Sequence, residues 1–414
     1  MTLKTILHTY RKLRSAKATA VALLLVLACG GLGAQVRFDY GVDARMLFDN
    51  RENDGSGNMF TPSMTIFAFR LNPEIGMKAV TGSPENGYGF RGETVHRVMA
   101  GIDATADFGS GVASRITATR EEGVRLLGEV TLYYSMEKQL SPKLKMELYA
   151  GIFSKDKTHG LRNQAGTVCP RYGDAFYSDS LRFYDPNYEG LLLSFTRPRS
   201  KWEVGVDWLG QIGKGRRERF VIFSAGEAAP RNWLKLGYSA YMYHFDNSLE
   251  VRGVVDNILL NPYVDFDLAP FLPLDRFSFS LGYLQAFQRD RINIGGYQCP
   301  QGGEFIFEMR KWNLSLRNTL YFGRDLMPLY NCFDAGGNKY GSELYFGDPY
   351  YRVRTELAAA ERPALYDRID IFWEPRIAPG LYLKVAARLN FNGRYSGSSQ
   401  IVALRFDLQE LTNR

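Results

Sequence analysis

The chain has 414 residues, with 51 Lys or Arg against 44 Asp or Glu, 41 Gly and 14% aromatic residues. This composition, at a mean hydropathy of -0.24, excludes a collagen, a coiled coil and a disordered chain, and it favours many strands with one polar face. The formal net charge of +7 does not indicate nucleic-acid binding, because five basic residues lie before position 35, where the chain has no acidic residue.

Residues 1–34 have the order of a secretory signal peptide. A basic, polar start is followed by an apolar run at 18–28 and by small residues that end at Ala34. The apolar run is too short to span a bilayer. We predict cleavage after Ala34, which leaves 35–414 as the mature protein; the alternative is a lipoprotein that is lipidated at Cys29.

The segment from Arg37 to Phe48 alternates strictly between apolar and polar residues. Its apolar face holds Phe38, Tyr40, Val42, Ala44, Met46 and Phe48, and its polar face holds Asp39, Gly41, Asp43 and Arg45. A period of two indicates a strand. A run of about twelve residues suits a tilted membrane-spanning strand, which needs about 9–11, better than a soluble strand of about five or six.

Similar alternation recurs at 67–78, 97–108, 129–136, 144–151, 190–196, 202–208, 232–244, 276–284, 304–310, 312–322, 367–374, 380–391 and 400–409. Short, turn-rich connections lie at 140–142, 197–200, 229–232 and 378–380, whereas 49–63, 154–189 and 323–350 are long. The segments 245–275 and 323–360 do not alternate cleanly. We predict an all-β fold: a single transmembrane antiparallel β-barrel of about 14–18 strands, with short periplasmic turns and long extracellular loops.

Charged residues on the polar faces are predicted to line the lumen of this barrel. The candidates are Arg45, Arg70, Glu74, Lys78, Arg97, Asp103, Glu203, Asp207, Arg388 and Arg405. The arginines among them are expected to favour anions, unless the acidic residues cancel their field. Trp202 and Trp208 lie roughly 20 Å apart along one strand, so we expect them at the two membrane interfaces.

Several segments resemble a poorly characterised group of porin-like outer-membrane β-barrel proteins from Bacteroidetes bacteria. They are Gly33-Ala34-Gln35, Phe48-Asp49-Asn50-Arg51-Glu52, the loop from Phe176 to Asn187, and Gly253-Val254-Val255-Asp256-Asn257. The resemblance covers most of residues 35–410. It implies insertion into the outer membrane, and it brings no catalytic residues.

No motif predicts catalysis or a cofactor. The mature chain has three histidines; His96 and His244 fall on apolar faces, and only His159 could serve a barrel hydrolase of the Ser-His type. Asp174, Asp179 and Asp185 lie in the long 154–189 loop, where they could ligate Ca²⁺, but they lack the spacing of a calcium loop. We therefore expect no enzyme, no metal and no cofactor.

The three cysteines of the mature chain are an odd number and lack Cys-x-x-Cys spacing. A bridge between Cys299 and Cys332 and a set of unpaired thiols, with Cys169, are equally consistent with this pattern.

The sequence favours a porin-like channel for passive diffusion of small hydrophilic solutes, with the 154–189 loop as a constriction. Its surroundings would be outer-membrane lipid and lipopolysaccharide. The first alternative is a structural or secretion-associated barrel that docks a partner protein through its loops, and the second is a barrel hydrolase.

Overall fold

The computed structural model describes residues 35–53, 64–82, 92–108, 124–161, 171–293, 295–344, 346–351, 363–391 and 396–408. The predictions made for the signal peptide, for Cys29 and for Cys169 fall outside these residues. Among the described residues, no helix is long and apolar enough to cross a membrane.

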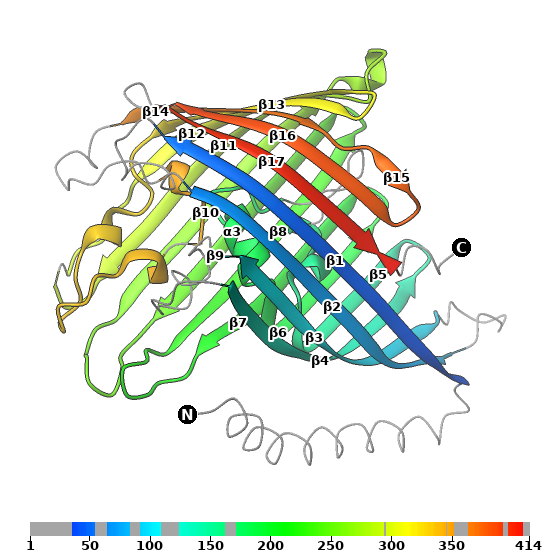
Figure 1. Ribbon diagram of the computed structural model, residues 1–414, viewed down its shortest axis with the longest axis horizontal. Helices are drawn as coiled ribbons and strands as arrows, with labels where there is room; N and C mark the ends of the chain where they lie inside the picture. The colour runs from blue at the N-terminus through cyan, green and yellow to red at the C-terminus, as the bar shows by residue number, and fades with distance from the viewer. Residues whose placement is uncertain are drawn as a thin grey trace.

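One antiparallel sheet contains all the strands that the structure describes (Figure 1). The strands are β1 (Gln35–Asn53), β2 (Met64–Thr81), β3 (Thr94–Phe108), β4 (Val124–Ser141), β5 (Leu144–Ser154), β6 (Asn187–Arg197), β7 (Ser200–Gly210), β8 (Arg219–Arg231), β9 (Leu234–Phe245), β10 (Val255–Asp267), β11 (Arg276–Asp290), β12 (Gln301–Lys311), β13 (Leu314–Gly323), β14 (Ala364–Trp373), β15 (Arg376–Ala378), β16 (Leu381–Phe391) and β17 (Ser396–Asp407). The helical segments are short: η1 (Lys155–Lys157), η2 (His159–Leu161), α3 (Asp179–Tyr184), η3 (Ala269–Phe271), η4 (Pro328–Asn331), η5 (Gly341–Leu344) and η6 (Pro349–Tyr351).

The sheet closes on itself, because β17 pairs with β1 along a register that runs from Asp43↔Asp407 to Asn53↔Gly397. Of its 17 strands, β15 has three residues and only extends the turn between β14 and β16, which pair directly. The wall formed by the described residues is thus a closed antiparallel barrel of 16 strands. This confirms the predicted fold class and strand number.

Short turns and long connections lie at opposite ends of the barrel. The predicted turns at 140–142, 197–200, 229–232 and 378–380 each join two consecutive wall strands. The long connections from β5 to β6 and from β13 to β14 leave the other end. The short turns and the long connections that the sequence predicts are therefore both present.

Two wall strands, β8 and β10, were missing from the predicted set of alternating segments. Their inward positions carry apolar residues such as Val221 and Phe223 on β8 and Val255 and Leu259 on β10, all of them buried in the main hydrophobic cluster. These apolar inward residues interrupt the alternation that would otherwise mark the two strands in the sequence.

The outer face of the wall is apolar around the whole barrel. Its exposed side chains include Phe38, Ile75, Ile102, Leu126, Val130, Leu191, Leu236, Leu281, Phe322, Ile371 and Val385, with Leu126 reaching 79% exposure. The alternate residues point inward and are mostly buried, and many of them are charged. A wall of this polarity suits a lipid-facing exterior and a polar interior.

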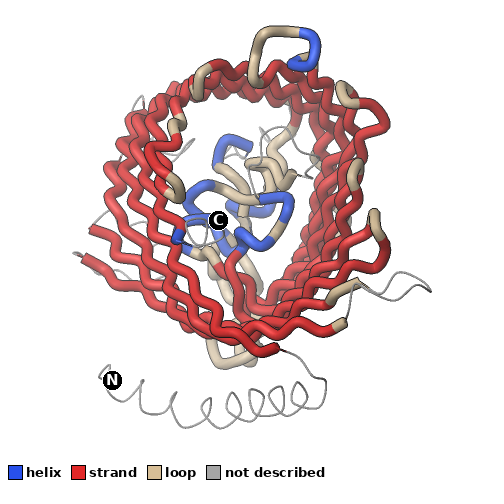
Figure 2. The backbone as a smooth tube through the Cα atoms, turned by 90° about the vertical axis from the view of Figure 1, so that its right-hand side faces the viewer, coloured by secondary structure: helices blue, strands red, loops and turns tan. Residues whose placement is uncertain are grey.

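The barrel interior contains two connections, which Figure 2 shows within the ring of strands. We name residues 155–161 and 171–186, between β5 and β6, the first inner loop. Residues 324–344 and 346–351, after β13, form the second inner loop. The candidate site lies between these two loops and the wall.

Candidate functional site in the barrel interior

Aromatic contacts fix the inner loops to one part of the wall. In the first inner loop, Phe176 packs edge-on against Tyr241 of β9, with ring centroids 5.5 Å apart. In the second, Phe346 packs against Tyr243 of β9 at 4.8 Å, and Tyr351 packs against Tyr321 of β13 at 5.3 Å. The inner loops therefore cover an aromatic part of the inner face of the wall.

The two inner loops also bind each other through their backbones. The Ser178 N–H donates to the Phe346 carbonyl at 2.7 Å, and the Asp348 N–H donates to the Asp174 carbonyl at 2.7 Å. The loops thus form one body inside the barrel.

Arg368 of β14 ties both inner loops to the wall. Its guanidinium donates to Asp174 of the first inner loop at 2.8 Å, to Asp348 of the second at 3.4 Å, and to Asp370 of β14 at 2.9 Å. The Arg368 side chain is only 4% exposed. Burial raises the pKa of Asp174, but the positive charges of Arg368 and then Arg317 outweigh burial and hold that pKa below its usual value.

A second arginine also joins the wall to the first inner loop. Arg388 of β16 binds Asp370 at 2.6 Å and reaches Asp179, the first residue of α3, at 3.0 Å. Three carboxylates that the sequence did not identify as part of the interior, Asp156, Asp348 and Asp370, therefore belong to it. The Arg368 and Asp370 pair was detectable, because both residues share the polar face of 367–374.

Three further arginines lie side by side on β2, β1 and β17. The strand register pairs Arg45 with Arg70 on one side and with Arg405 on the other. Arg70, which is 2% exposed, binds both oxygens of Asp103, with Nε to Oδ1 at 2.8 Å. Arg45 binds Asp43 at 2.6 Å and Asp156 of the first inner loop.

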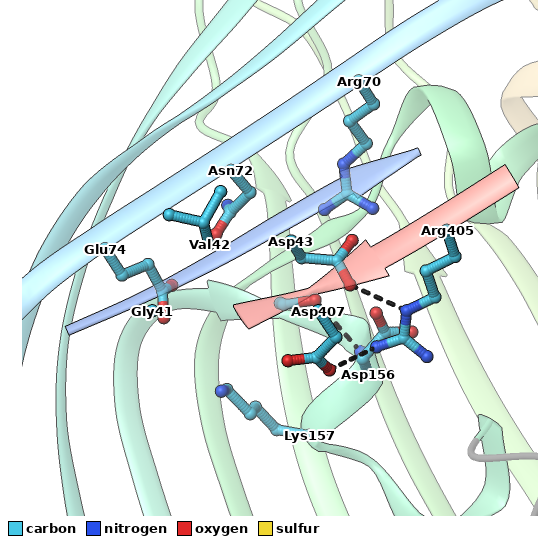
Figure 3. A pocket seen from close by; sticks show the side chains of 11 residues that line it. Gly41, Val42, Asp43, Arg70, Asn72, Glu74, Asp156, Lys157, Arg405 and Asp407 are labelled. Carbon is cyan, nitrogen blue, oxygen red and sulfur yellow. Dashed lines mark hydrogen bonds and ion pairs between the residues drawn. The ribbon is translucent and has the colours of Figure 1, made fainter. Parts of the chain in front are cut away.

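Arg405 completes this row. It binds Asp43 at 2.8 Å and Asp407 at 3.2 Å. Next to the row is a small open pocket between the wall and η1 (Figure 3). Its lining includes Asp43, Arg70, Glu74, Arg405 and Asp407, together with Asp156 and Lys157 of the first inner loop.

The other predicted interior residues are placed as follows. Glu203 accepts the backbone N–H groups of His159 at 2.7 Å and Gly160 at 2.9 Å. Asp207 accepts the Glu189 N–H at 2.9 Å. These two carboxylates bind backbone rather than facing open space.

At the short-turn end, Arg97 contacts Asp39 at 3.2 Å and also binds Glu137. Lys78 is half-buried and is paired in register with Arg37 and Arg97. Arg97 is thus compensated by two acidic residues.

The two predicted interface tryptophans lie on the outer face of β7. Trp202 is 39% exposed, and its indole N–H donates to the Tyr238 hydroxyl at 2.7 Å. Trp208 stacks on Phe220 with ring centroids 5.7 Å apart.

The side chain of His159 contacts wall residues. Its Nε2 lies 3.2 Å from Glu147 Oε2 and 3.4 Å from Thr196 Oγ1. His244 lies against Phe220 on the outer face, with ring centroids 4.8 Å apart. These contacts anchor a loop and a strand end.

Within the described part of the chain, no group of three or more His, Cys, Asp or Glu side chains could hold a metal ion. Asp174 and Asp179 face arginines, as described above, and Asp185 faces Lys155 at 3.1 Å. Cys299 and Cys332 are free thiols, so the alternative of a bridge between them is wrong.

The closed 16-strand barrel, its apolar outer face and its charged interior define a porin-like β-barrel of the bacterial outer membrane.

No protein-family model matches the sequence, and no curated protein matches it. Several solved structures are similar in fold. OpdK of Pseudomonas aeruginosa, solved with vanillate, has 10% identity and a TM-score of 0.44, over 89% of this chain and 98% of that chain. A loop L8 deletion mutant of OmpT, an outer membrane protein of Vibrio cholerae, has 8% identity and a TM-score of 0.48, over 90% and 99%. OccAB4 of Acinetobacter baumannii has 10% identity and a TM-score of 0.45, over 90% and 98%.

Proposed function

We propose that the protein is a constricted outer-membrane channel for passive diffusion of small hydrophilic solutes, of the porin-like type that occurs in Bacteroidetes. Its outer face would contact lipid and lipopolysaccharide. The observation that carries the proposal is the polarity of the interior. The inner loops cover the aromatic part of the wall, whereas the part from β14 through β17 and β1 to β3 keeps a row of charged side chains beside an open pocket.

In this proposal the solute path runs between the inner loops and the arginine-bearing wall. The first inner loop faces that wall with Asp156, Asp174 and Asp179, and each of them contacts an arginine. Ion pairs therefore hold the constriction in place, and it does not act as a swinging lid. This supports the role that the sequence suggests for the 154–189 loop.

Planar-bilayer recording with the purified protein tests the proposal. We expect discrete conductance steps. Removing the contact between Arg388 and Asp179 with Asp179→Ala should widen the path and raise the single-channel conductance. A matched control is Asp275→Ala, an exposed carboxylate in the β10–β11 turn.

Absence of conductance steps from correctly folded protein would reject the channel. It would favour the alternative in which the barrel is structural and docks a partner protein through its long loops. We propose no catalytic activity, and His159→Ala should accordingly impair only the packing of the first inner loop.

A further inference from the structure

A group of polar residues lies on the outer face of the barrel, at the end with the long connections. We name Asp256 of β10, Arg289 of β11, Arg291 and Tyr297 the outer rim cluster. Asp256 and Arg289 point outward, because the residues on either side of each are buried inside the barrel, and the two are paired in the strand register. Charged side chains stand out on a face that is otherwise apolar.

The cluster lies where the apolar outer face ends. One row of register partners runs from Trp208 of β7 through Phe220 and His244 to Asp256 and Arg289. The next outward row toward the midplane, about 7 Å away along the strands, is apolar throughout. It consists of Val206, Ile222, Met242, Ile258 and Phe287. Because tryptophan is enriched at the membrane interface, the row that begins with Trp208 lies at the height of the lipid headgroups.

The cluster has more positive than negative charge. Arg289 donates to Asp256 through Nε at 3.0 Å and Nη2 at 2.8 Å, and Arg291 donates to the same carboxylate at 2.9 and 2.6 Å. Two guanidiniums therefore share one carboxylate, whereas the interior arginines each have their own acidic partners. The next carboxylate of the rim, Asp246, contacts His244 at 3.5 Å.

Both arginines keep donors for a further partner. A guanidinium has five N–H groups, and each arginine uses only Nε and Nη2 for Asp256. Among the described residues, Nη1 of Arg289 and Nη1 of Arg291 have no hydrogen-bond acceptor. The Arg291 side chain is 49% exposed, so an external ligand can reach it.

The cluster is also held in a fixed shape. Gln288 of β11 and Gln298 exchange two backbone hydrogen bonds, at 2.8 and 2.7 Å, which continue the pairing of β11 with β12 beyond the wall. Tyr297 is thereby held next to β11, and the Arg289 guanidinium lies 4.4 Å from the centre of its ring. Since the wall and this extension fix Arg289, little conformational entropy is lost when it binds a ligand.

From this placement we infer that the outer rim cluster binds a phosphate group of lipopolysaccharide. Guanidinium groups match the oxygens of a phosphate with paired hydrogen bonds, and an anionic headgroup is attracted by the excess positive charge. The phosphate would contact Arg289 and Arg291, and the acyl chains would lie along Ile258 and Phe287. The lipid is lipopolysaccharide because the long connections are extracellular. The inference rests on the outer-membrane surroundings in the proposed function and assigns a site to them.

Native mass spectrometry of the detergent-purified protein, titrated with lipid, tests the inference. The probes are lipid A, which is the phosphorylated and acylated part of lipopolysaccharide, the same lipid A after removal of its phosphate, and inorganic phosphate. We expect lipid A to bind at least about tenfold more tightly than the dephosphorylated form, given the strength of hydrogen bonds to charged groups. Inorganic phosphate lacks the acyl chains and should not displace lipid A at equal concentration.

Arg291→Glu should weaken lipid A binding at least about tenfold, because it replaces an attractive charge with a repulsive one. Arg291 follows the last residue of β11, so the wall strands stay unchanged. The matched control is Arg199→Glu in the exposed turn between β6 and β7, at the opposite end of the barrel, and it should bind as wild type. Arg289→Gln is a second variant that should also weaken binding, and it keeps the test decisive if Arg291→Glu fails to fold.

Four results would overturn the inference: equal binding of lipid A and its dephosphorylated form, displacement of lipid A by inorganic phosphate at equal concentration, wild-type affinity in a folded Arg291→Glu or Arg289→Gln variant, or an equal loss in Arg199→Glu. Conductance steps from a protein that does not bind lipid A would leave the channel standing and reject this site. Lipid A binding without conductance steps would do the reverse, so the two proposals can fail separately.

Discussion

Arg368 illustrates how single side chains organise the interior. Its guanidinium contacts carboxylates from β14 and from both inner loops, in a place that water hardly reaches. Removing one partner from a buried ionic group leaves the other charges uncompensated. The resulting loss of folding free energy is larger than the net contribution of the pair itself.

We predict that Arg368→Gln destabilises the protein by about 3–5 kcal/mol, because it leaves buried carboxylates unpaired. Urea unfolding in detergent would measure this loss, and limited proteolysis should cut the inner loops sooner. The control is Arg199→Gln in the exposed β6–β7 turn. Equal stability of the two variants would contradict the role of Arg368.

The pKa of Asp174 predicts the pH range in which the inner loops stay in place. Its pKa is held below its usual value in the folded protein, so its contribution to stability is present above the unfolded value of about 3.9 and is lost as pH falls through the lower folded value. The aromatic circular dichroism of the inner-loop tyrosines should thus stay constant from about pH 5 to 8 and fall below about pH 4. A transition between pH 6 and 7 would contradict this and point to a histidine.

At the scale of one element, β7 separates lipid-facing from inward residues most clearly. Trp202, Val204, Val206 and Trp208 point outward, and Glu203, Gly205 and Asp207 point inward. The two faces should respond very differently to a change of charge.

We predict that Val206→Arg on β7 destabilises the inserted barrel by about 2–4 kcal/mol, because it places a cation near the bilayer midplane. Asp207→Asn, its neighbour on the inward face, should fold normally, since an amide oxygen can still accept the Glu189 N–H. Folding into lipid vesicles, followed by urea titration, would compare the two. The face assignment is wrong if both variants prove equally stable.

For the whole molecule, the pairing of charges sets the ion selectivity that we expect of the proposed channel. The sequence predicts anion preference from Arg45, Arg70, Arg97 and Arg388, but every one of them faces at least one carboxylate. Opposite charges this close largely cancel each other's field along the solute path.

We therefore expect weak ion selectivity in the wild-type protein. Arg388→Gln should shift the reversal potential in a salt gradient toward cations, and Asp370→Asn should shift it toward anions by a similar amount, because each exposes the charge of its partner. A strong anion preference that survives Arg388→Gln would show that other residues set the selectivity.

The sequence by itself determined the barrel, because a membrane-spanning strand must alternate lipid-facing and inward residues, and this period of two is local. Segments such as 37–48 and 202–208 record it directly, and the charged candidates Arg45, Arg70 and Glu74 follow from the same parity. Alternation failed on β8 and β10, where the inner loops supply an apolar environment from residues more than 40 positions away. Only the tertiary structure decided that these loops enter the barrel, that Arg368 joins them to the wall, and that Arg70 binds Asp103. Such contacts depend on residues distant in sequence, and no local pattern encodes which carboxylate meets which arginine.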